Sequence, residues 1–484
     1  MTAVAGTRPV DRKDAARGRV LLLSTYDLGH QPFGLASPAA WLTAAGHRVD
    51  CLDLSRCPLD PALVAGASAI AFHIPMHTAT RLAIDAYAAV RAINPQARIC
   101  FYGLYGQANL DHLTALGADA VISGEYEAEL LAWVSDDGGS PIPAHRRVTM
   151  LDKLDFVVPD RSGLPPLASY AQLAVGAERR VVGYTESTRG CRHLCRHCPV
   201  APVYGGRVRV VQRDVVLADV AAQVVAGAQH ITFGDPDFFN ASGHAVRVIE
   251  DLHGRWPDLT YDVTIKVEHL LRHVKLLPVL AATGCLFVTS AVESVDDTVL
   301  AILDKGHTRA EFIESVAACR EAGVVMNPTF VAFHPWLTRA GLLDTFDVLN
   351  DLDLVGSLAP IQLTTRLLVP EGSLLLGLPE YAHLWQSLDR DRLVYPWTHP
   401  DPAMDGLQRE FEAEVADAGR NGADRYTTFD RLWTLAGGCP PARGEHPHVV
   451  VPQFMEPWFC CSEPVGELVT GWTIPETQEV IAAG

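Results

Sequence analysis

The sequence has no stripe of clustered Lys and Arg. Its 39 basic residues stand against 57 acidic ones, and the formal net charge is −18. Nucleic acids are held by clustered positive side chains that neutralise phosphates, so we expect no nucleic-acid partner. No stretch approaches the ~20 apolar residues that a membrane-spanning helix requires, and the charged N-terminal stretch lacks the apolar core of a secretory signal. We therefore expect a cytoplasmic protein without a membrane partner.

The cysteine content argues against a disulfide framework. There are eleven cysteines, an odd number, which is typical of reduced thiols in the cytoplasm. Several lie singly in or beside apolar runs and are interpreted as small buried side chains; they are Cys51, Cys57, Cys100, Cys285 and Cys319. The others include two clusters, and these carry most of the chemical information.

The order of apolar runs predicts an α/β protein of two or three domains. After a disordered lead (1–18), strands and helices alternate over 19–135, which predicts a doubly wound, Rossmann-like parallel sheet. Residues 136–180 are rich in Gly, Pro, Asp and Ser and are interpreted as a linker. Six further strand–helix units over 181–375 predict a partial (β/α)6 barrel with chemistry at the carboxyl ends of its strands. A mainly helical cap and a tail are expected over 376–484.

One cysteine cluster directly follows the first expected barrel strand, in TRGCRHLCRHCPVAP. Cys191, Cys195 and Cys198 have CxxxCxxC spacing, so their thiolates can converge on one soft-metal centre. Structural zinc sites and fully ligated 4Fe–4S clusters take four ligands, and three cysteines leave one position open. A zinc site completed by His193 or His197 is the alternative interpretation.

This loop, placed after the first strand of a βα barrel, resembles the radical SAM enzymes. The resemblance implies that the three cysteines hold a 4Fe–4S cluster and that S-adenosylmethionine (SAM) chelates the fourth iron. An electron from the cluster then splits a sulfonium carbon–sulfur bond and releases a carbon radical. A small-molecule substrate and an external electron donor of the flavodoxin or ferredoxin type are implied as partners.

Further stretches resemble motifs of the same family. FGDPD, at the end of the second barrel strand, is similar to the turn whose backbone carbonyls hold the SAM amino group. SAVES, with the later KGHT, is similar to a stretch that faces the SAM ribose or carboxylate, and His334-Pro335-Trp336 to a turn that supports adenine. The resemblance thus assigns cofactor binding to Phe233, Gly234, Asp235, Ser290, Glu293, Ser294 and His334. Ser294 alternatively reads as the N-cap of the next helix.

Two charged residues at barrel strand ends are further candidates. Lys266 follows the third expected strand and Arg366 ends the sixth. A charge in a barrel mouth is unfavourable unless it is paired or binds something, so each is a candidate for SAM or substrate binding.

The first domain resembles the cobalamin-binding domain that is fused to many radical SAM proteins. The resemblance rests on FGLASPAAWLTAAGHRVDCLDLS and GADAVISGEYEAE. The DxHxxG motif, whose His ligates cobalt in other cobalamin proteins, is absent here, as it is in many radical SAM fusions. Cobalamin is a candidate cofactor of this domain, and an empty Rossmann domain retained for structure is the alternative.

The second cysteine cluster is the adjacent pair Cys460 and Cys461 in PWFCCSEPV. Two neighbouring soft thiols can grip a soft electrophile such as trivalent arsenic. CCSEP resembles the tail of the CUAEP/CCAEP radical SAM group, which is related to enzymes that join the 3-amino-3-carboxypropyl group of SAM to arsenic. The pair is our candidate for holding substrate, and a packed, inert pair is the alternative.

Three functions stay open from the sequence. The first is a radical SAM enzyme that adds a SAM fragment to a heteroatom, such as arsenic, of a small molecule held by the tail. The second is a cobalamin-dependent radical SAM methyltransferase. The third, from another class, is a non-catalytic iron–sulfur or zinc thiol sensor.

Overall fold

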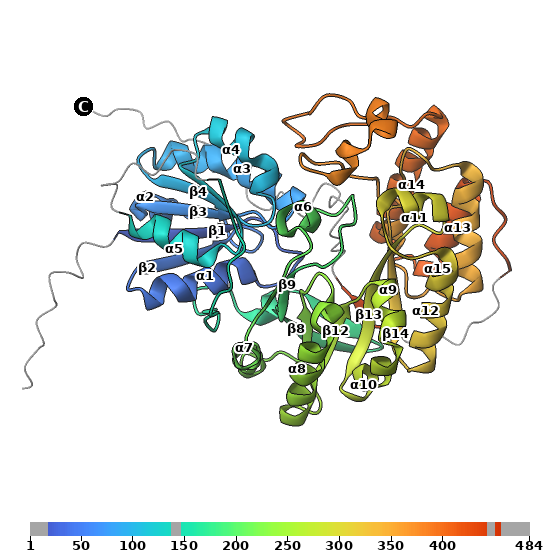
Figure 1. Cartoon of the computed structure of the whole chain (residues 1–484), viewed down its shortest axis with the longest axis horizontal. Coiled ribbons are helices and arrows are strands. Elements are labelled where there is room, and N and C mark those ends of the chain that lie inside the picture. The colour runs from blue at the N-terminus through green and yellow to red at the C-terminus, as the bar shows by residue number, and fades with distance from the viewer. Residues whose placement is uncertain (1–17, 137–146, 443–450, 456–484) are drawn as a thin grey trace, which may run out of the picture.

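The computed structural model describes residues 18–136, 147–442 and 451–455, which form two large sheets and a short two-stranded one, with helices around them (Figure 1). The first sheet has six parallel strands in the order β2-β1-β3-β4-β5-β6. They are β1 (Arg19–Ser24), β2 (Arg48–Asp53), β3 (Ala69–His73), β4 (Arg98–Tyr102), β5 (Ala120–Gly124) and β6 (Arg147–Met150). The helices between them are α1 (Phe33–Ala44), α2 (Pro61–Gly66), α3 (His77–Ile93), α4 (Leu110–Leu116) and α5 (Glu127–Ser135).

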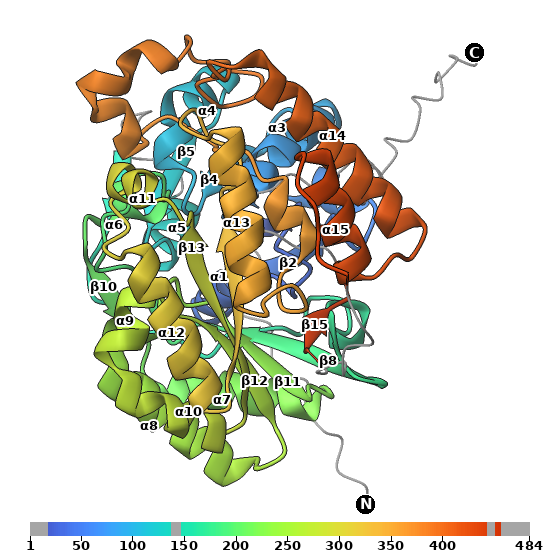
Figure 2. The same cartoon turned by 90° about the vertical axis from the view of Figure 1, so that its right-hand side faces the viewer.

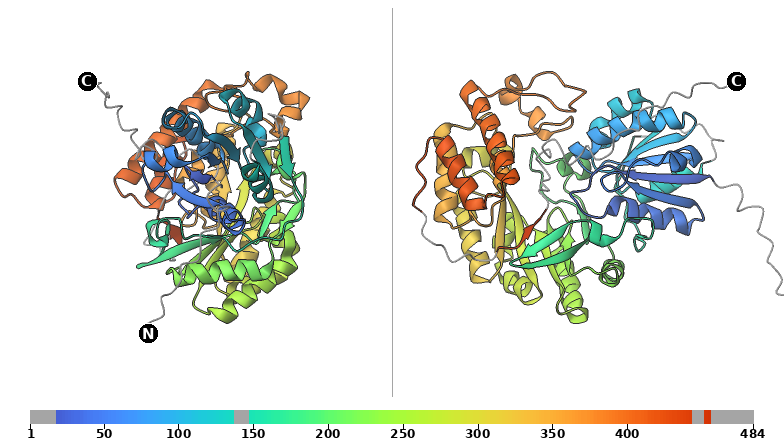
Figure 3. Two further views of the ribbon diagram at one scale, coloured as in Figure 1. Left: turned by 90° about the vertical axis from the view of Figure 1, so that its left-hand side faces the viewer. Right: turned by 180° about the vertical axis from the view of Figure 1, so that it is seen from behind.

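Both faces of the first sheet are covered by helices, as the view from behind shows (Figure 3). Successive residues of β1 point to opposite faces and enter two different apolar clusters. Leu21 and Leu23 pack with residues of α2, α3 and α4, whereas Val20 and Leu22 pack with residues of α1 and α5. This is the predicted doubly wound arrangement. Ligands of such sheets bind beyond the carboxyl ends of the strands, where the strand order reverses between β1 and β3.

The second sheet has seven strands in the order β14-β13-β12-β11-β8-β7-β15 and forms the half-barrel. Neighbours from β8 to β14 are parallel, and β7 and β15 pair antiparallel at one edge. The strands are β7 (Gln172–Val175), β8 (Glu178–Thr185), β11 (His230–Phe233), β12 (Thr260–Thr264), β13 (Cys285–Glu293), β14 (Val325–Phe330) and β15 (Gln453–Phe454).

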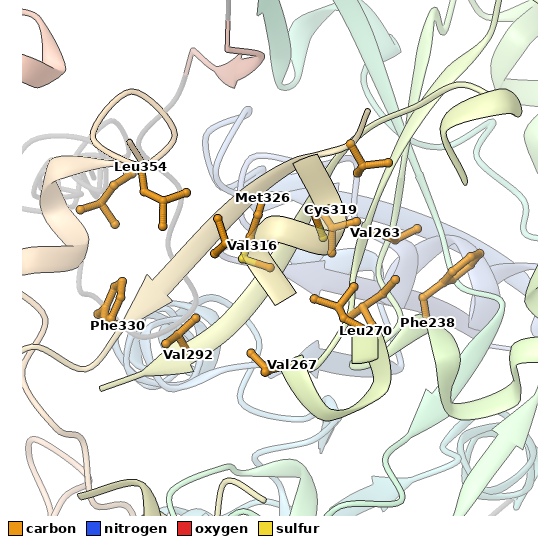
Figure 4. Packing of buried hydrophobic residues seen from close by; sticks show 14 of the residues in the cluster. Phe238, Val263, Val267, Leu270, Val292, Val316, Cys319, Met326, Phe330 and Leu354 are labelled. Atoms are coloured by element: carbon orange, nitrogen blue, oxygen red, sulfur yellow. The ribbon is translucent and has the colours of Figure 1, made fainter. Parts of the chain in front are cut away.

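Helices lie on the outer side of this sheet (Figure 2). They are α7 (Arg213–Val225), α8 (Ser242–Arg255), α9 (Val267–Arg272), α10 (Leu277–Ala282), α11 (Asp297–Leu303), α12 (Arg309–Glu321) and α13 (Arg339–Asp351). Val263 of β12, Val292 of β13 and Met326 of β14 pack against Val316 and Cys319 of α12 (Figure 4). This apolar layer fixes which strand faces look toward the helices and which look into the barrel.

The predicted sixth barrel strand is reduced to a single bridge. The 3-10 turn η5 (Pro360–Leu363) occupies the start of this stretch, and Phe333 and Arg366 form an isolated parallel bridge after it. The side-chain oxygen of Gln362 accepts the Phe330 N–H at 3.1 Å, a place that a strand carbonyl would otherwise take. A side chain therefore closes this edge of the sheet. The predicted fold class of a Rossmann-like domain followed by a partial barrel is confirmed.

Two long helices follow, α14 (Pro402–Arg420) and α15 (Arg425–Leu435). They pack on α13 through aromatic rings: Phe346 stacks on Trp433 with ring centroids 5.7 Å apart and contacts Phe411 and Phe429 edge-on. The 3-10 helices η6 (Leu374–Gly377) and η7 (Pro379–Leu384) precede them. Among the described residues, no helix is long and apolar enough to cross a membrane.

A buried guanidinium joins the two sheets. Between them lie the short strand β9 (Thr188–Gly190) and helix α6 (Val200–Tyr204) (Figure 1). Strand β10 (Val208–Val210) pairs with β9. Arg189 of β9 contacts Glu127 at 2.7 and 2.9 Å, Glu125 at 3.2 Å and Glu186 at 2.6 Å. Burial raises the pKa of Glu125 and of Glu186, and Arg189 opposes that rise. One cation thus holds two buried carboxylates and a half-buried one, from both parts of the chain.

Replacing this cation tests the join. Arg189→Met leaves the buried Glu125 and Glu127 and the half-buried Glu186 without their counter-charge. Loss of one partner costs about 3–5 kcal/mol in comparable buried pairs. We expect the midpoint of urea-induced unfolding to fall markedly. The control is Arg180→Met, because Arg180 pairs at 3.1 Å with an exposed Glu178, and such a surface pair contributes about 0–1 kcal/mol. Equal midpoints for the two variants would contradict the assignment.

Candidate functional site

The three clustered cysteines lie on one loop between β9 and α6, just beyond the first strand of the half-barrel, β8. Cys195 is buried, and Cys191 and Cys198 are half-buried free thiols. The Cys198 N–H donates to the Cys195 carbonyl at 3.1 Å, so the chain turns tightly between them. Burial raises the pKa of Cys191 and raises that of Cys198 to about 12. These thiols therefore stay protonated at neutral pH unless a bound metal supplies positive charge.

Asn240 fixes the start of this loop. Its side-chain oxygen accepts the Arg192 N–H at 3.1 Å and the Cys191 thiol at 3.9 Å, and its amide group donates to the Gly190 carbonyl at 3.4 Å. Asn240 lies in the 3-10 helix η3 (Phe238–Ala241), directly after the turn that ends β11. Sequence reasoning missed this residue, and its only signal is its place a few residues after FGDPD.

The FGDPD turn itself is clasped to the connection between β8 and β9. The buried Asp235 carboxylate accepts the Ser187 N–H at 2.8 Å and the hydroxyls of Ser187 and Thr188 at 2.7 and 2.6 Å. Burial raises the pKa of Asp235 to about 6 against these hydrogen bonds. A Cβ on Gly234 would overlap the Tyr184 ring, so only glycine fits there. Phe233 packs into the apolar core, and its backbone ends β11.

Glu293, at the end of β13, meets the cysteine loop. Its carboxylate lies 3.1 Å from His197 Nε2 and 3.3 Å from Lys305 Nζ. Burial favours the neutral acid, but Lys305 and His197 outweigh it and lower the pKa of Glu293 to about 2. Its backbone has φ +70°, a conformation that a residue with a Cβ adopts at some cost and that recurs at functional sites. Glu293 is thus an ionised anchor between the cysteine loop and the KGHT loop.

Lys266 also reaches the cysteine loop, through a carboxylate. Its ammonium lies 3.6 Å from Glu268 Oε2, and the same oxygen lies 3.5 Å from His193 Nδ1. Gly306 packs over this pair, and a Cβ there would come within 2.9 Å of the Glu268 carboxylate. The predicted candidate Lys266 is therefore close to the loop that carries the cysteines.

Ser290 is not brought to the barrel mouth. It lies on the same face of β13 as Val288 and Val292, which belong to the apolar layer under the helices. Its neighbours Thr289 and Ala291 are the half-buried positions that face the other way. The alternation of a strand therefore puts Ser290 on the helix side.

Ser294 and His334 line one small cavity with Glu293, of about 20 Å³. The hydroxyl of Ser294 accepts the Asp296 N–H at 3.1 Å. Asp296, rather than Ser294, caps α11, because its carboxylate accepts the Thr298 N–H at 2.7 Å. The alternative interpretation of Ser294 as the N-cap was therefore wrong. The ring of His334 lies against Trp336 with centroids 5.7 Å apart, and burial lowers its pKa to about 4.

Arg366 is engaged by the helical region instead of the cysteine loop. It donates to Asp405 at 2.7 Å and to the Trp397 carbonyl at 2.8 Å, and its guanidinium lies 3.6 Å from the Trp397 ring centroid. These contacts explain its charge without a ligand. The candidate pair Cys460 and Cys461 lies outside the described residues.

A cavity of about 320 Å³ lies between the first domain and the cysteine loop. The first domain contributes Leu104 and Tyr105, which follow β4, and the facing wall includes His197, Cys198 and Pro199. The carboxyl edge of the first sheet, where ligands of such sheets bind, therefore opens toward the cysteines.

Comparison with known proteins identifies the half-barrel. Residues 185–347 match the family model described as the radical SAM superfamily. The bacteriochlorophyllide d C-8(2)-methyltransferase of Chlorobaculum tepidum is 26% identical over 262 residues, covering 49% of this chain and 52% of that protein. A putative methylthiotransferase of Methanocaldococcus jannaschii is 26% identical over 185 residues, covering 35% and 39%. The chain thus spans about half, or less, of the length of these relatives.

Solved structures of similar fold contain both domains. One is the radical SAM methyltransferase TsrM from Kitasatospora setae, solved with tryptophan and a SAM analogue. The match has a TM-score of 0.58 at 16% identity and covers 76% of this chain and 77% of the TsrM chain. The cobalamin-dependent radical SAM enzyme OxsB, solved with aqua-cobalamin, has a TM-score of 0.61 at 12% identity and covers 86% and 72%. At these identities the likeness shows the shared fold.

The matched segment contains the CxxxCxxC loop, the turn after β11 and Glu293 at the end of β13. Such a domain implies a 4Fe–4S cluster and SAM, and it indicates a SAM-cleaving enzyme. The chain therefore contains a radical SAM domain over residues 185–347.

Proposed function

We propose that this protein is a cobalamin-dependent radical SAM methyltransferase that acts on a small molecule. The observation that carries the proposal is the cavity between Leu104 and Tyr105 of the first domain and His197 and Cys198 of the cysteine loop. A group bound at the carboxyl edge of the first sheet would face the loop of the cluster. The buried Arg189 network supports this arrangement by fixing that edge against β9.

Cys191, Cys195 and Cys198 hold the 4Fe–4S cluster in this proposal. When bound, the cluster supplies a low-potential electron and one iron for SAM. The two imidazoles of the loop favour three thiolate ligands over a zinc site: His197 Nε2 lies 3.1 Å from the Glu293 carboxylate, and both nitrogens of His193 lie within 3.6 Å of carboxylates. Asn240 holds the first cysteine in place, and the positive charge of Lys305 acts on Cys195 and Cys198.

SAM would bind beside the cluster, between the turn at Phe233, Gly234 and Asp235 and the Lys266 side of the barrel mouth. Asp235 keeps that turn in position by accepting three hydrogen bonds from Ser187 and Thr188. The ion pair between Glu293 and Lys305 fixes the KGHT loop near this turn. Ser294 and His334 are buried beside Glu293.

Cobalamin would bind at the carboxyl edge of the first sheet and supplies a centre for methyl transfer when bound. The fit is supported by the cavity at this edge, to which the first domain contributes the largely apolar side chains of Leu104 and Tyr105. His73, at the end of β3, packs against Gly34, and burial lowers its pKa to about 3. It is thus enclosed in the domain, so cobalt would be held without a protein histidine from β3. TsrM and OxsB, which share the fold, were solved with cobalamin.

A second candidate function rests on Cys460 and Cys461. Two adjacent thiols suit a soft electrophile, and a SAM-derived 3-amino-3-carboxypropyl fragment added to it would form a carbon–heteroatom bond. The two candidates differ in the SAM product, because the second leaves methylthioadenosine. In both, a flavodoxin- or ferredoxin-type protein supplies the electron.

The products of SAM distinguish these functions. The protein is reconstituted anaerobically with iron and sulfide and incubated with SAM and dithionite, with and without hydroxocobalamin. We expect S-adenosylhomocysteine only when cobalamin is bound, and loss of all products in Cys198→Ala. Methylthioadenosine formed without cobalamin, and lost in Cys460→Ser, would contradict the methyltransferase and support the second candidate.

Glu293→Gln tests the anchoring of the cysteine loop. It removes the charge that pairs with Lys305 and His197, and loss of a partner that orients metal-site residues typically lowers activity about 10–100-fold. We expect SAM cleavage to fall by this factor while the visible absorption of the cluster is retained. Glu321→Gln, on the exposed end of α12, is the matched control and should be unchanged. Full activity of Glu293→Gln would exclude the role.

A further inference from the structure

A second group of metal-ligating side chains lies beside the cysteine loop. It consists of His193 from the loop, Asp237 from the turn after β11, and His269 from α9. One ligand atom from each lies within 4.8 Å of the others. Asp237 and His269 are 1% and 3% exposed. Three separate elements therefore bring two imidazoles and a carboxylate to one enclosed point.

The contacts within this group are close but are not hydrogen bonds. His269 Nδ1 lies 2.7 Å from Asp237 Oδ2, and His193 Nε2 lies 3.6 Å from the same oxygen. In the described part of the chain, none of these three atoms has a hydrogen-bond partner. Buried polar atoms are rarely left in this state, and an ion bound between the three would satisfy all of them at once.

The other side-chain polar atoms of Asp237 and His193 have partners of their own, as is usual for metal ligands. Asp237 Oδ1 accepts the Phe239 N–H at 3.0 Å, which leaves Oδ2 alone facing the imidazoles. His193 Nδ1 lies 3.5 Å from Glu268 Oε2, so its Nε2 is the nitrogen that faces Asp237. A ligating histidine commonly presents its other ring nitrogen to a carboxylate, which fixes the tautomer and the ring.

We propose that His193 Nε2, Asp237 Oδ2 and His269 Nδ1 form a binding site for a divalent first-row transition metal, separate from the three cysteines. Ligands at about 2.0 Å from a tetrahedral ion are about 3.3 Å apart, and the observed separations of 2.7 and 3.6 Å lie on either side of this value. Two imidazoles and one carboxylate suit Zn²⁺ or Fe²⁺ rather than Mg²⁺ or Ca²⁺.

Such an ion would tie the cysteine loop to the turn after β11 and to helix α9. His193 stands between Cys191 and Cys195, Asp237 ends the FGDPD turn that also holds Asp235, and His269 lies within α9. The site adds a fixed point to the loop that is independent of the cluster, and it leaves a coordination position open to water or a ligand.

The test uses Zn²⁺ alone as probe on the full-length, cluster-containing protein under anaerobic conditions. After dialysis against Zn²⁺ and desalting, zinc and iron are counted and the zinc K-edge absorption is recorded. We expect about one tightly held zinc per chain with nitrogen and oxygen neighbours near ~2.0–2.1 Å and no sulfur neighbours near ~2.3 Å. Sulfur neighbours, or no retained zinc, would overturn the proposal. This measurement uses the unmodified protein, so it does not depend on whether a variant folds.

Variants assign the ligands. Asp237→Asn and His269→Ala should each weaken zinc retention by at least tenfold while the iron count and the visible absorption of the cluster stay the same. His273→Ala is the matched control, because His273 lies next to His269 with ring centroids 5.8 Å apart but is not one of the three ligands. Unchanged zinc retention in Asp237→Asn, or equal loss in His273→Ala, would contradict the assignment.

Discussion

The buried guanidinium of Arg189, two residues before the first cysteine of the loop, holds the two sheets in their mutual orientation. It contacts carboxylates from the end of the first sheet and from the strand that leads to the loop. Three anions around one cation are tolerated only because further donors share the charge: Tyr204 donates to Glu125 at 3.0 Å and Ser37 to Glu127 at 2.6 Å. The ligand edge of the first domain and the cysteine loop are thereby fixed by one network.

The cysteine loop is held on several sides by groups that are not its own. Asn240 binds its first residues, Glu293 binds His197 in its second half, and Glu268 reaches His193 in the middle. Glu293 ends β13, and Asn240 and Glu268 follow the carboxyl ends of β11 and β12 within a few residues. The strand order therefore decides which side chains can contact the loop. These contacts fix the loop that carries the three thiols. Such support is what a metal site requires from its surroundings.

Much of this architecture is readable from the sequence. Alternating apolar runs predict the two parallel sheets, and CxxxCxxC after a strand predicts where the chemistry lies. The absence of a full sixth barrel strand could not be predicted from the sequence. It depends on the hydrogen bond from the Phe330 N–H to the side-chain oxygen of Gln362, which only the tertiary structure brings together. For the same reason, the sequence does not indicate that Arg189 pairs with Glu125 and Glu127, which lie more than 60 residues earlier in the chain. Ser290 and Arg366 look like ligands in the sequence, but strand alternation and the Asp405 pair give them structural places.

The central claim is that three cysteines leave one iron open for SAM. Electron paramagnetic resonance of the reduced, reconstituted protein tests it most directly, because SAM bound to an iron changes the signal of the cluster. The account predicts the signal of a reduced 4Fe–4S cluster whose shape changes when SAM is added. A cluster signal that is insensitive to SAM, or a protein that takes up zinc in place of the cluster, would contradict it.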